Sequence, residues 1–130
     1  MAFYINNRNN GDISKKAAST AFEVGQFLQY DGSGYLVPAT TGKVVGICNE
    51  AVSSASPDYA VARDLSISIP TQNDEIIIPV ITGTATQALV GTLVNVDSSD
   101  PTGVDVTSGS HSQILVTRFI NASTILGKIA

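Results

Sequence analysis

The chain has 130 residues and a net charge of −4, with 43% hydrophobic and only 14% charged residues. This length suits one domain around one hydrophobic core. The sequence pI of about 4.6 argues against a nucleic-acid partner, because phosphate binding needs clustered Lys and Arg, and no run approaches the ~20 apolar residues of a membrane span.

Residue usage favours β-structure. The sequence contains 14 Ser, 12 Thr, 13 Val and 13 Ile against 7 Leu. Branched side chains lose rotamer freedom in helices but pack well on a pleated surface. The composition therefore predicts an all-β fold, either a small antiparallel β-barrel or a β-sandwich.

The N-terminal segment differs from the rest of the chain. A short apolar tip at residues 3–5 precedes the polar, turn-prone residues 6–12, and residues 14–20 are too few to sustain an isolated helix. We predict an extended N-terminal arm over residues 1–21 that becomes ordered on a neighbouring subunit. The start also lacks the basic-then-apolar order of a secretory signal, so we expect a protein made and used without export.

Residues 22–130 are expected to form a single β domain. Alternating apolar positions between Phe22 and Tyr30 predict a strand, and the Asp-Gly-Ser-Gly sequence at residues 31–34 predicts a tight hairpin turn. Residues 35–37 lead back to Pro38, which suits the edge of a sheet. A further strand is expected over residues 43–48.

The middle of the chain continues this pattern. Residues 53–58 have the composition of a loop, and residues 60–63 fit either a strand or a single turn. Residues 65–69 alternate as a strand. The near-continuous apolar run at residues 75–81 predicts a strand that is covered on both faces.

An internal repeat links the two halves of the chain. Residues 24–31 (VGQFLQYD) align without gaps to residues 90–97 (VGTLVNVD), with three identical positions of eight. Each segment continues through an Asp turn, a second strand and a Thr- or Ser-Gly turn. The repeat predicts two related hairpin units within the β domain, and chance similarity between two amphipathic hairpins is the alternative explanation.

The sequence offers few candidates for catalysis. Cys48 and His111 are the only residues of their types, and neither lies in a sequence typical of an activated nucleophile. Cys48 is expected to be a small buried hydrophobe and His111 a surface loop residue. Asp74 and Glu75 are adjacent, and adjacent strand residues point to opposite faces. We predict no enzymatic activity, no catalytic residues and no cofactor.

Metal binding has little support in the sequence. Asp97, Asp100 and Asp105 offer oxygen ligands for a hard cation, but their spacing matches no known ligand loop. Pro101 and Gly103 are typical of an ordinary turn. We therefore predict no metal site and leave a bound cation at these three carboxylates as the open alternative.

One segment resembles a known family. Residues 25–40 (GQFLQYDGSGYLVPAT), followed by VVGICNEA at residues 44–51, are similar to the capsid cement proteins that decorate tailed-phage heads. The closing sequence TILGKI at residues 124–129 also resembles the C-terminal strand of that family. The clear similarity lies within residues 25–51, and a weaker one extends over most of residues 22–130.

The resemblance implies a structural role in a virion. Such proteins bind the major capsid protein on the outer surface of the capsid, commonly as homotrimers, and stabilise the shell after assembly in the host cytoplasm. A Ser- and Thr-rich, weakly charged β surface is compatible with this role. A trimer would also bury apolar strand faces such as those around residues 76–81.

Two other classes of function remain as alternatives. The first is a glycan- or ligand-binding β module, such as a virion-surface adhesin, that uses an exposed loop at residues 97–112. The second is a small hydrolase that uses Cys48 and His111.

Overall fold

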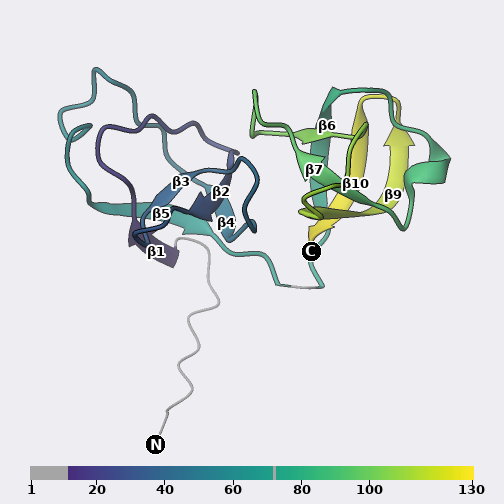
Figure 1. Ribbon diagram of the computed structural model, residues 1–130, viewed down its shortest axis with the longest axis horizontal. Helices are drawn as coiled ribbons and strands as arrows, with labels where there is room; N and C mark the ends of the chain where they lie inside the picture. The colour runs from purple at the N-terminus through teal and green to yellow at the C-terminus, as the bar shows by residue number, and fades with distance from the viewer. Residues whose placement is uncertain (1–11, 72) are drawn as a thin grey trace, which may run out of the picture.

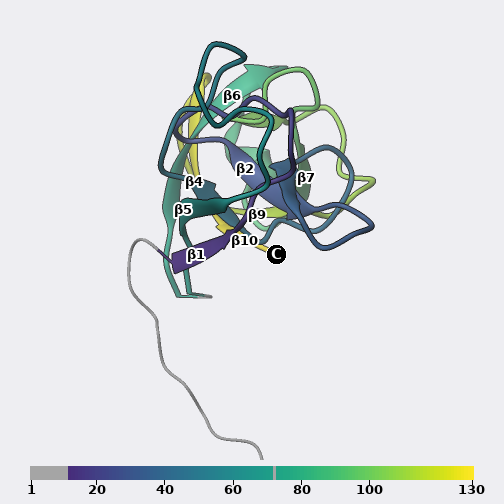
Figure 2. The same cartoon turned by 90° about the vertical axis from the view of Figure 1, so that its left-hand side faces the viewer.

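The computed structural model describes residues 12–71 and 73–130, which form two β-rich lobes placed end to end (Figure 1). Viewed from the end of the molecule, the first lobe lies in front of the second (Figure 2). The fold is all-β, as the composition predicts. Among the described residues the single helix is the three-residue 3-10 turn η1 (Gln87–Leu89), and no helix there is long and apolar enough to cross a membrane.

The first lobe is a curled five-stranded sheet with the order β1-β5-β4-β2-β3. Its strands are β1 (Asp12–Lys15), β2 (Phe27–Tyr30), β3 (Leu36–Pro38), β4 (Gly46–Cys48) and β5 (Asp64–Ser68). An isolated parallel bridge between Lys16 and Leu36 brings the continuation of β1 back to β3. The sheet therefore curls almost into a barrel.

The second lobe is a closed barrel with the order β10-β6-β8-β7-β9. Its strands are β6 (Ile76–Thr82), β7 (Leu93–Val96), β8 (Val104–Asp105), β9 (Ile114–Asn121) and β10 (Thr124–Ile129). The β6–β8 pair is parallel and the other pairs are antiparallel. A barrel of this kind has no free strand edge.

The structure revises the predicted arm and decides between the two alternatives for residues 60–63. Of the predicted arm, residues 1–11 lie outside the described residues, whereas residues 12–15 form β1 and pair with β5. An extended backbone suits a strand as well as an arm, and β1 pairs with a strand of the same chain. Residues 60–63 are a turn and bend that lead into β5.

The predicted repeat is confirmed by the strand pairing. Phe27 pairs with Ile47 between β2 and β4, and Leu93 pairs with Leu115 between β7 and β9. Phe27 is aligned with Leu93 in the sequence repeat, so their partners Ile47 and Leu115 also correspond. The second lobe thus keeps the register of the first, with a slightly longer connection between the paired strands.

The closing contacts of the two lobes also correspond. Lys16 bridges Leu36 in parallel in the first lobe, and Val80 pairs with Val104 in parallel in the second. Both lobes therefore have the same five-stranded topology. In each, the first strand along the chain, or its continuation, pairs in parallel with the third strand. The main difference is the connection before the last strand, which spans residues 49–63 in the first lobe and residues 122–123 in the second.

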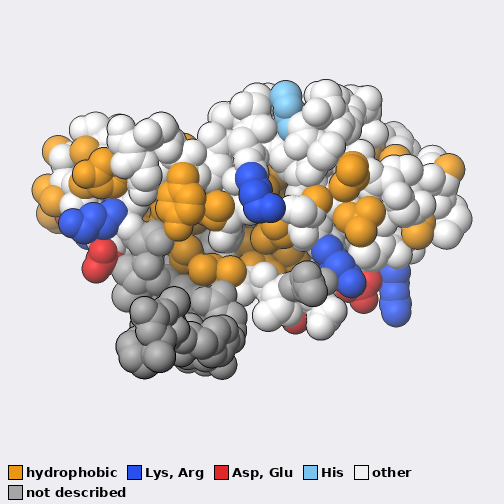
Figure 3. All heavy atoms as spheres, turned by 60° about the horizontal axis from the view of Figure 1, so that its bottom comes forward, with side chains coloured by type: hydrophobic (Ala, Val, Ile, Leu, Met, Phe, Trp, Pro, Cys, Tyr) orange, Lys and Arg blue, Asp and Glu red, His pale blue; other side chains and the backbone are white. Residues whose placement is uncertain are grey.

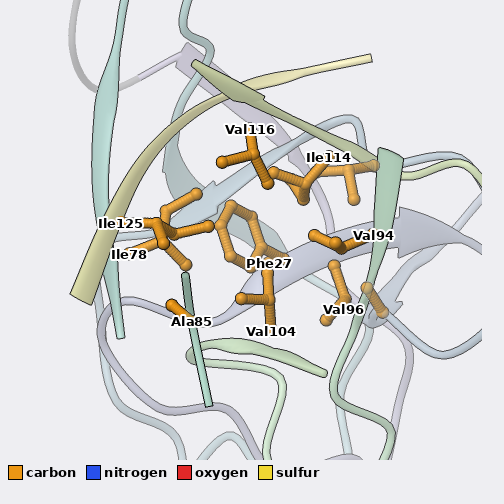
Figure 4. Packing of buried hydrophobic residues seen from close by; sticks show 11 residues of the cluster. Phe27, Ile78, Ala85, Val94, Val96, Val104, Ile114, Val116 and Ile125 are labelled. Carbon is orange, nitrogen blue, oxygen red and sulfur yellow. The ribbon is translucent and has the colours of Figure 1, made fainter. Parts of the chain in front are cut away.

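The two lobes share part of their core through Phe27. This side chain is 2% exposed and belongs to the hydrophobic cluster of the second lobe, although β2 belongs to the first. In Figure 4 the ring of Phe27 lies between Ile78 and Ile125 on one side and Val94 on the other. The interior of the first lobe forms a separate cluster that includes Leu28, the next residue along β2.

Hydrogen bonds reinforce this junction. The backbone N–H of Phe27 donates to the Pro101 carbonyl at 2.8 Å. The side chain of Gln113 is 2% exposed, and its Nε2 donates to the carbonyls of Thr40 at 3.2 Å and Gly42 at 2.7 Å. The amino group of Gln113 is thereby satisfied by the first lobe, while its Oε1 accepts a hydrogen bond from the Val96 N–H of its own lobe at 2.9 Å.

The expectation that the apolar run at residues 75–81 is covered on both faces is wrong for this chain alone. Ile78 points into the barrel and is fully buried, but Ile77 is 71% exposed and Ile81 is 39% exposed. The barrel wall has one inner and one outer face, and the described chain covers only the inner one.

Candidate functional site

Cys48 and His111 are not brought together. Cys48 lies on β4 in the core of the first lobe, 1% exposed, and its Sγ donates to the Glu50 carbonyl at 3.0 Å. Burial raises the pKa of this thiol, which keeps it protonated. His111 is exposed in the second lobe, in the loop before β9. The predictions of a buried Cys48 and a surface His111 are confirmed, and the pair does not form a nucleophile with its base.

The three carboxylates of residues 97–105 form separate turns. In each, the Asp Oδ1 accepts hydrogen bonds from both the backbone N–H and the hydroxyl of the residue two positions later. The pairs are Asp97 with Ser99, Asp100 with Thr102, and Asp105 with Thr107. Within residues 12–71 and 73–130, no group of three or more His, Cys, Asp or Glu side chains is placed to hold a metal ion.

Asp97 is the most buried of these carboxylates, at 3% exposed. Burial raises its pKa, but hydrogen bonds from the Ser99 and Thr82 side chains and from the backbone of Ser99 and Asp100 outweigh burial, so the pKa is lowered overall. The ionised form is therefore built into the wall of the barrel, where it ties the loop after β7 to the end of β6.

Asp74 and Glu75 also have different partners. Asp74 Oδ2 accepts a hydrogen bond from the Thr71 backbone at 2.8 Å. Glu75 Oε2 accepts one from the Thr117 hydroxyl at 2.6 Å and lies 3.8 Å from Nε of Arg118. The two carboxylates do not share a site.

Residues 49–63 form a braced loop over the first lobe. Arg63 forms an ion pair with Glu50 at 2.7 Å and another with Asp58. Hydrogen bonding from Arg63 lowers the pKa of both carboxyls. These contacts tie the start and the middle of the loop to the guanidinium group at its end.

The same loop is also held by hydrogen bonds from a buried lysine. Lys16 is 0% exposed, and its Nζ donates to the carbonyls of Val61 at 2.6 Å and Tyr59 at 3.3 Å. Its position in the strand pairing corresponds to Val80 in the second lobe. The sequence around Lys16 is polar, and nothing in it signals that this side chain enters a core.

The outer face of β6 presents an apolar strip, which we define as Ile77, Pro79 and Ile81. All three are exposed, and they share one face because alternate strand residues point the same way. Ile77 lies opposite Leu126 of β10. The apolar run is evident in the sequence, but its pattern does not indicate which face of the strand is exposed to solvent.

Other hydrophobic side chains reach the surface, and Figure 3 shows them gathered over both lobes on the face turned to the viewer. On the outer face of β7, Leu93 is 42% exposed, and on the first lobe Tyr30 is 46% exposed. We find no pocket in the described part of the chain. Comparison with models of known protein families, with curated proteins and with solved structures found no match.

Proposed function

We propose that this chain is a non-enzymatic virion protein that decorates the outer surface of a tailed-phage capsid and stabilises the shell by binding the major capsid protein as a homotrimer. The sequence resemblance at residues 25–51 motivates the proposal. The single observation that carries it is the exposed apolar strip on β6.

The apolar strip is suited to a flat protein surface. Ile77, Pro79 and Ile81 lie in a row on a closed barrel, which cannot rearrange to cover them. An exposed apolar face of this kind is typical of a protein–protein contact. It offers neither a groove for a peptide nor a free edge for an added strand.

The size of the strip favours attachment by several copies at once. Burying one exposed Ile side chain contributes about 1.5–3 kcal/mol, and association itself costs at least about 4 kcal/mol. A strip of three residues therefore supports only weak binding by one copy. A homotrimer that presents three strips would bind much more tightly through effective concentration.

Rigidity supports the same role. Turns closed by Asp and hydroxyl side chains and a barrel without free edges leave little freedom to lose on binding. A rigid clamp across neighbouring capsid subunits resists their separation.

The test mixes the purified protein with expanded, undecorated capsids of the phage that encodes it. We expect the protein to cosediment with the capsids and to raise their disruption temperature, whereas Ile77→Asp weakens binding at least about tenfold. Val24→Asp, at a residue 62% exposed on the first lobe, is the matched control and leaves binding unchanged. Wild-type protein that neither binds nor protects the capsids would overturn the proposal.

A further inference from the structure

The outer face of β6 presents the most exposed large apolar side chain of the described residues. Ile77 is 71% exposed, and it pairs with Leu126 of β10, which is half-buried on the same outer face. Both edges of β6 are occupied, by β10 and by β8, so no further strand of the barrel covers this pair. A cover for the pair has to come from residues outside 12–71 and 73–130 or from another molecule.

The first eleven residues of the chain contain one apolar cluster. Phe3, Tyr4 and Ile5 are consecutive, and in the polar residues 6–11 that follow them Arg8 is the only charged side chain. Residues 1–11 lie outside the described residues and join the fold at the start of β1. The segment thus has the composition of a polar tether that ends in an apolar tip.

The pairing of β1 places this tether beside the connection to β6. Asp12 pairs with Ile67, and the register between β1 and β5 is constant over four pairs. The strand β6 begins nine positions after Ile67, and Phe3 lies nine positions before Asp12. Nine extended residues span about 30 Å, so the segment is long enough to reach the start of β6 by the route of the connection. Both β1 and this connection lie at the lower side of the molecule (Figure 1, Figure 2).

The charges along the connection match the charge of the tether. Asp74 and Glu75 directly precede β6; Asp74 is exposed, and the side chain of Glu75 is 33% exposed. A segment that continued the register of β1 and β5 would bring Arg8 opposite Thr71, three positions from Asp74. Exposed pairs of opposite charge attract only weakly, but here they favour the same route that the reach of the tether allows.

We propose that Phe3 and Ile5 dock on the Ile77–Leu126 pair of the same chain and cover this end of the apolar strip. Phe3 and Ile5 are alternate residues, so they share one face of an extended backbone. The flat strip has no groove for a free peptide, but the tether of residues 6–11 keeps the apolar tip at a high effective concentration. A partner of the strip has to displace the tip, which reduces its apparent affinity in proportion to the fraction of strips left uncovered. The docking does not depend on the proposed capsid function.

The test is NMR spectroscopy of the purified full chain with a spin label at Arg118→Cys. Arg118 lies on the outer face beside the strip with its side chain 70% exposed, whereas the native Cys48 is 1% exposed and escapes labelling. We expect the label to broaden the amide signals of residues 3–5 relative to the reduced, diamagnetic label. Ile77→Asp weakens docking at least about tenfold and removes most of this broadening. Val24→Asp, at a residue 62% exposed on the first lobe, is the matched control and leaves the broadening unchanged.

A mixture of chains distinguishes docking within one chain from docking on a second copy. Isotope-labelled chains without a spin label are mixed with unlabelled chains that carry it, so only docking between chains broadens the observed signals. We expect no broadening in this mixture. Absence of broadening within the spin-labelled chain, equal broadening after Ile77→Asp, or broadening in the mixture would each overturn the proposal. Docking in a protein that does not bind capsids would leave it standing and refute only the capsid function.

Discussion

At the scale of single residues, the abundant hydroxyls have a definite structural use. Asp97, Asp100 and Asp105 each accept two hydrogen bonds from a Ser or Thr two positions later, and Asn121 does the same with Ser123. Such turns satisfy the polar backbone of connections too short for other partners. A chain poor in charge thereby employs several of its few carboxylates as turn formers.

The buried carboxylate of Asp97 is expected to make stability depend on pH. Its pKa is lowered in the folded state, so its contribution is present above the ordinary aspartate pKa of about 4 and is lost as pH falls through the folded value. We expect Asp97→Asn to lower the free energy of unfolding by about 1–3 kcal/mol at neutral pH. The difference from wild type should shrink in acid, as measured by urea denaturation at pH 7 and pH 3.

Asp64→Asn is the matched control, because Asp64 is exposed at the start of β5. It should leave the unfolding free energy nearly unchanged at both pH values. A deficit for Asp97→Asn of equal size at pH 7 and pH 3 would contradict the assigned role of the ionised carboxylate.

At the scale of elements, the two lobes show how one strand pairing tolerates different connections. Residues 49–63 join β4 to β5, whereas residues 122–123 join β9 to β10. Loops accept such insertions because the added backbone lies at the surface. The longer loop needs its own support, which Lys16 supplies from the position that Val80 holds in the other lobe.

Replacing this lysine tests the support of the loop. In Lys16→Met the Val61 carbonyl loses the Lys16 donor and the Tyr59 carbonyl retains the Ser19 N–H, which should cost about 1–3 kcal/mol of unfolding free energy. We expect faster cleavage within residues 53–61 by a nonspecific protease. The adjacent Lys15 is exposed, so Lys15→Met should match wild type in both measurements. Equal cleavage of the two variants would show that Lys16 does not hold the loop.

The strands are largely predictable from the sequence, because alternation and turn chemistry act locally. The Asp31 turn and the alternation at residues 65–69 give β3, β5 and the end of β2 closely, but β2 begins at Phe27 and not at Phe22, because residues 24–25 form a turn. The exposure of Ile77 is not predictable, since a continuous apolar run looks the same whether its outer face meets the same chain or a partner. The role of Lys16 is equally hidden, because its carbonyl partners Tyr59 and Val61 lie far along the chain and meet it only in the folded lobe.

At the scale of the whole molecule, the lobes are joined by a shared core, to which the first lobe contributes Phe27, Ala39 and Val44. Each lobe alone has about 60 residues, a size at which a single core is marginal. Phe27 makes the core of the second lobe continuous with the strand framework of the first. The sequence repeat reveals the two units. Because Phe27 and Leu93 occupy aligned positions of the repeat, the repeat does not reveal which of the two residues is buried.

Removing the Phe27 ring should uncouple the lobes. We expect Phe27→Ala to lower the free energy of unfolding by about 3–5 kcal/mol and to split thermal unfolding, followed by calorimetry, into two transitions. Tyr35→Ala is the matched control, because Tyr35 is an aromatic residue 37% exposed on the same lobe. A single transition at the wild-type midpoint for Phe27→Ala would contradict a coupling role.

The burial of Phe27 also has a consequence for synthesis on the ribosome. Phe27 is translated well before β6, and the strands of the first lobe are complete at Ser68, before any strand of the second has been made. Domains commonly fold in this order as the chain emerges. We therefore expect the second barrel to close around an aromatic ring already held in place, with the nascent first lobe as the template on which the rest of the chain folds.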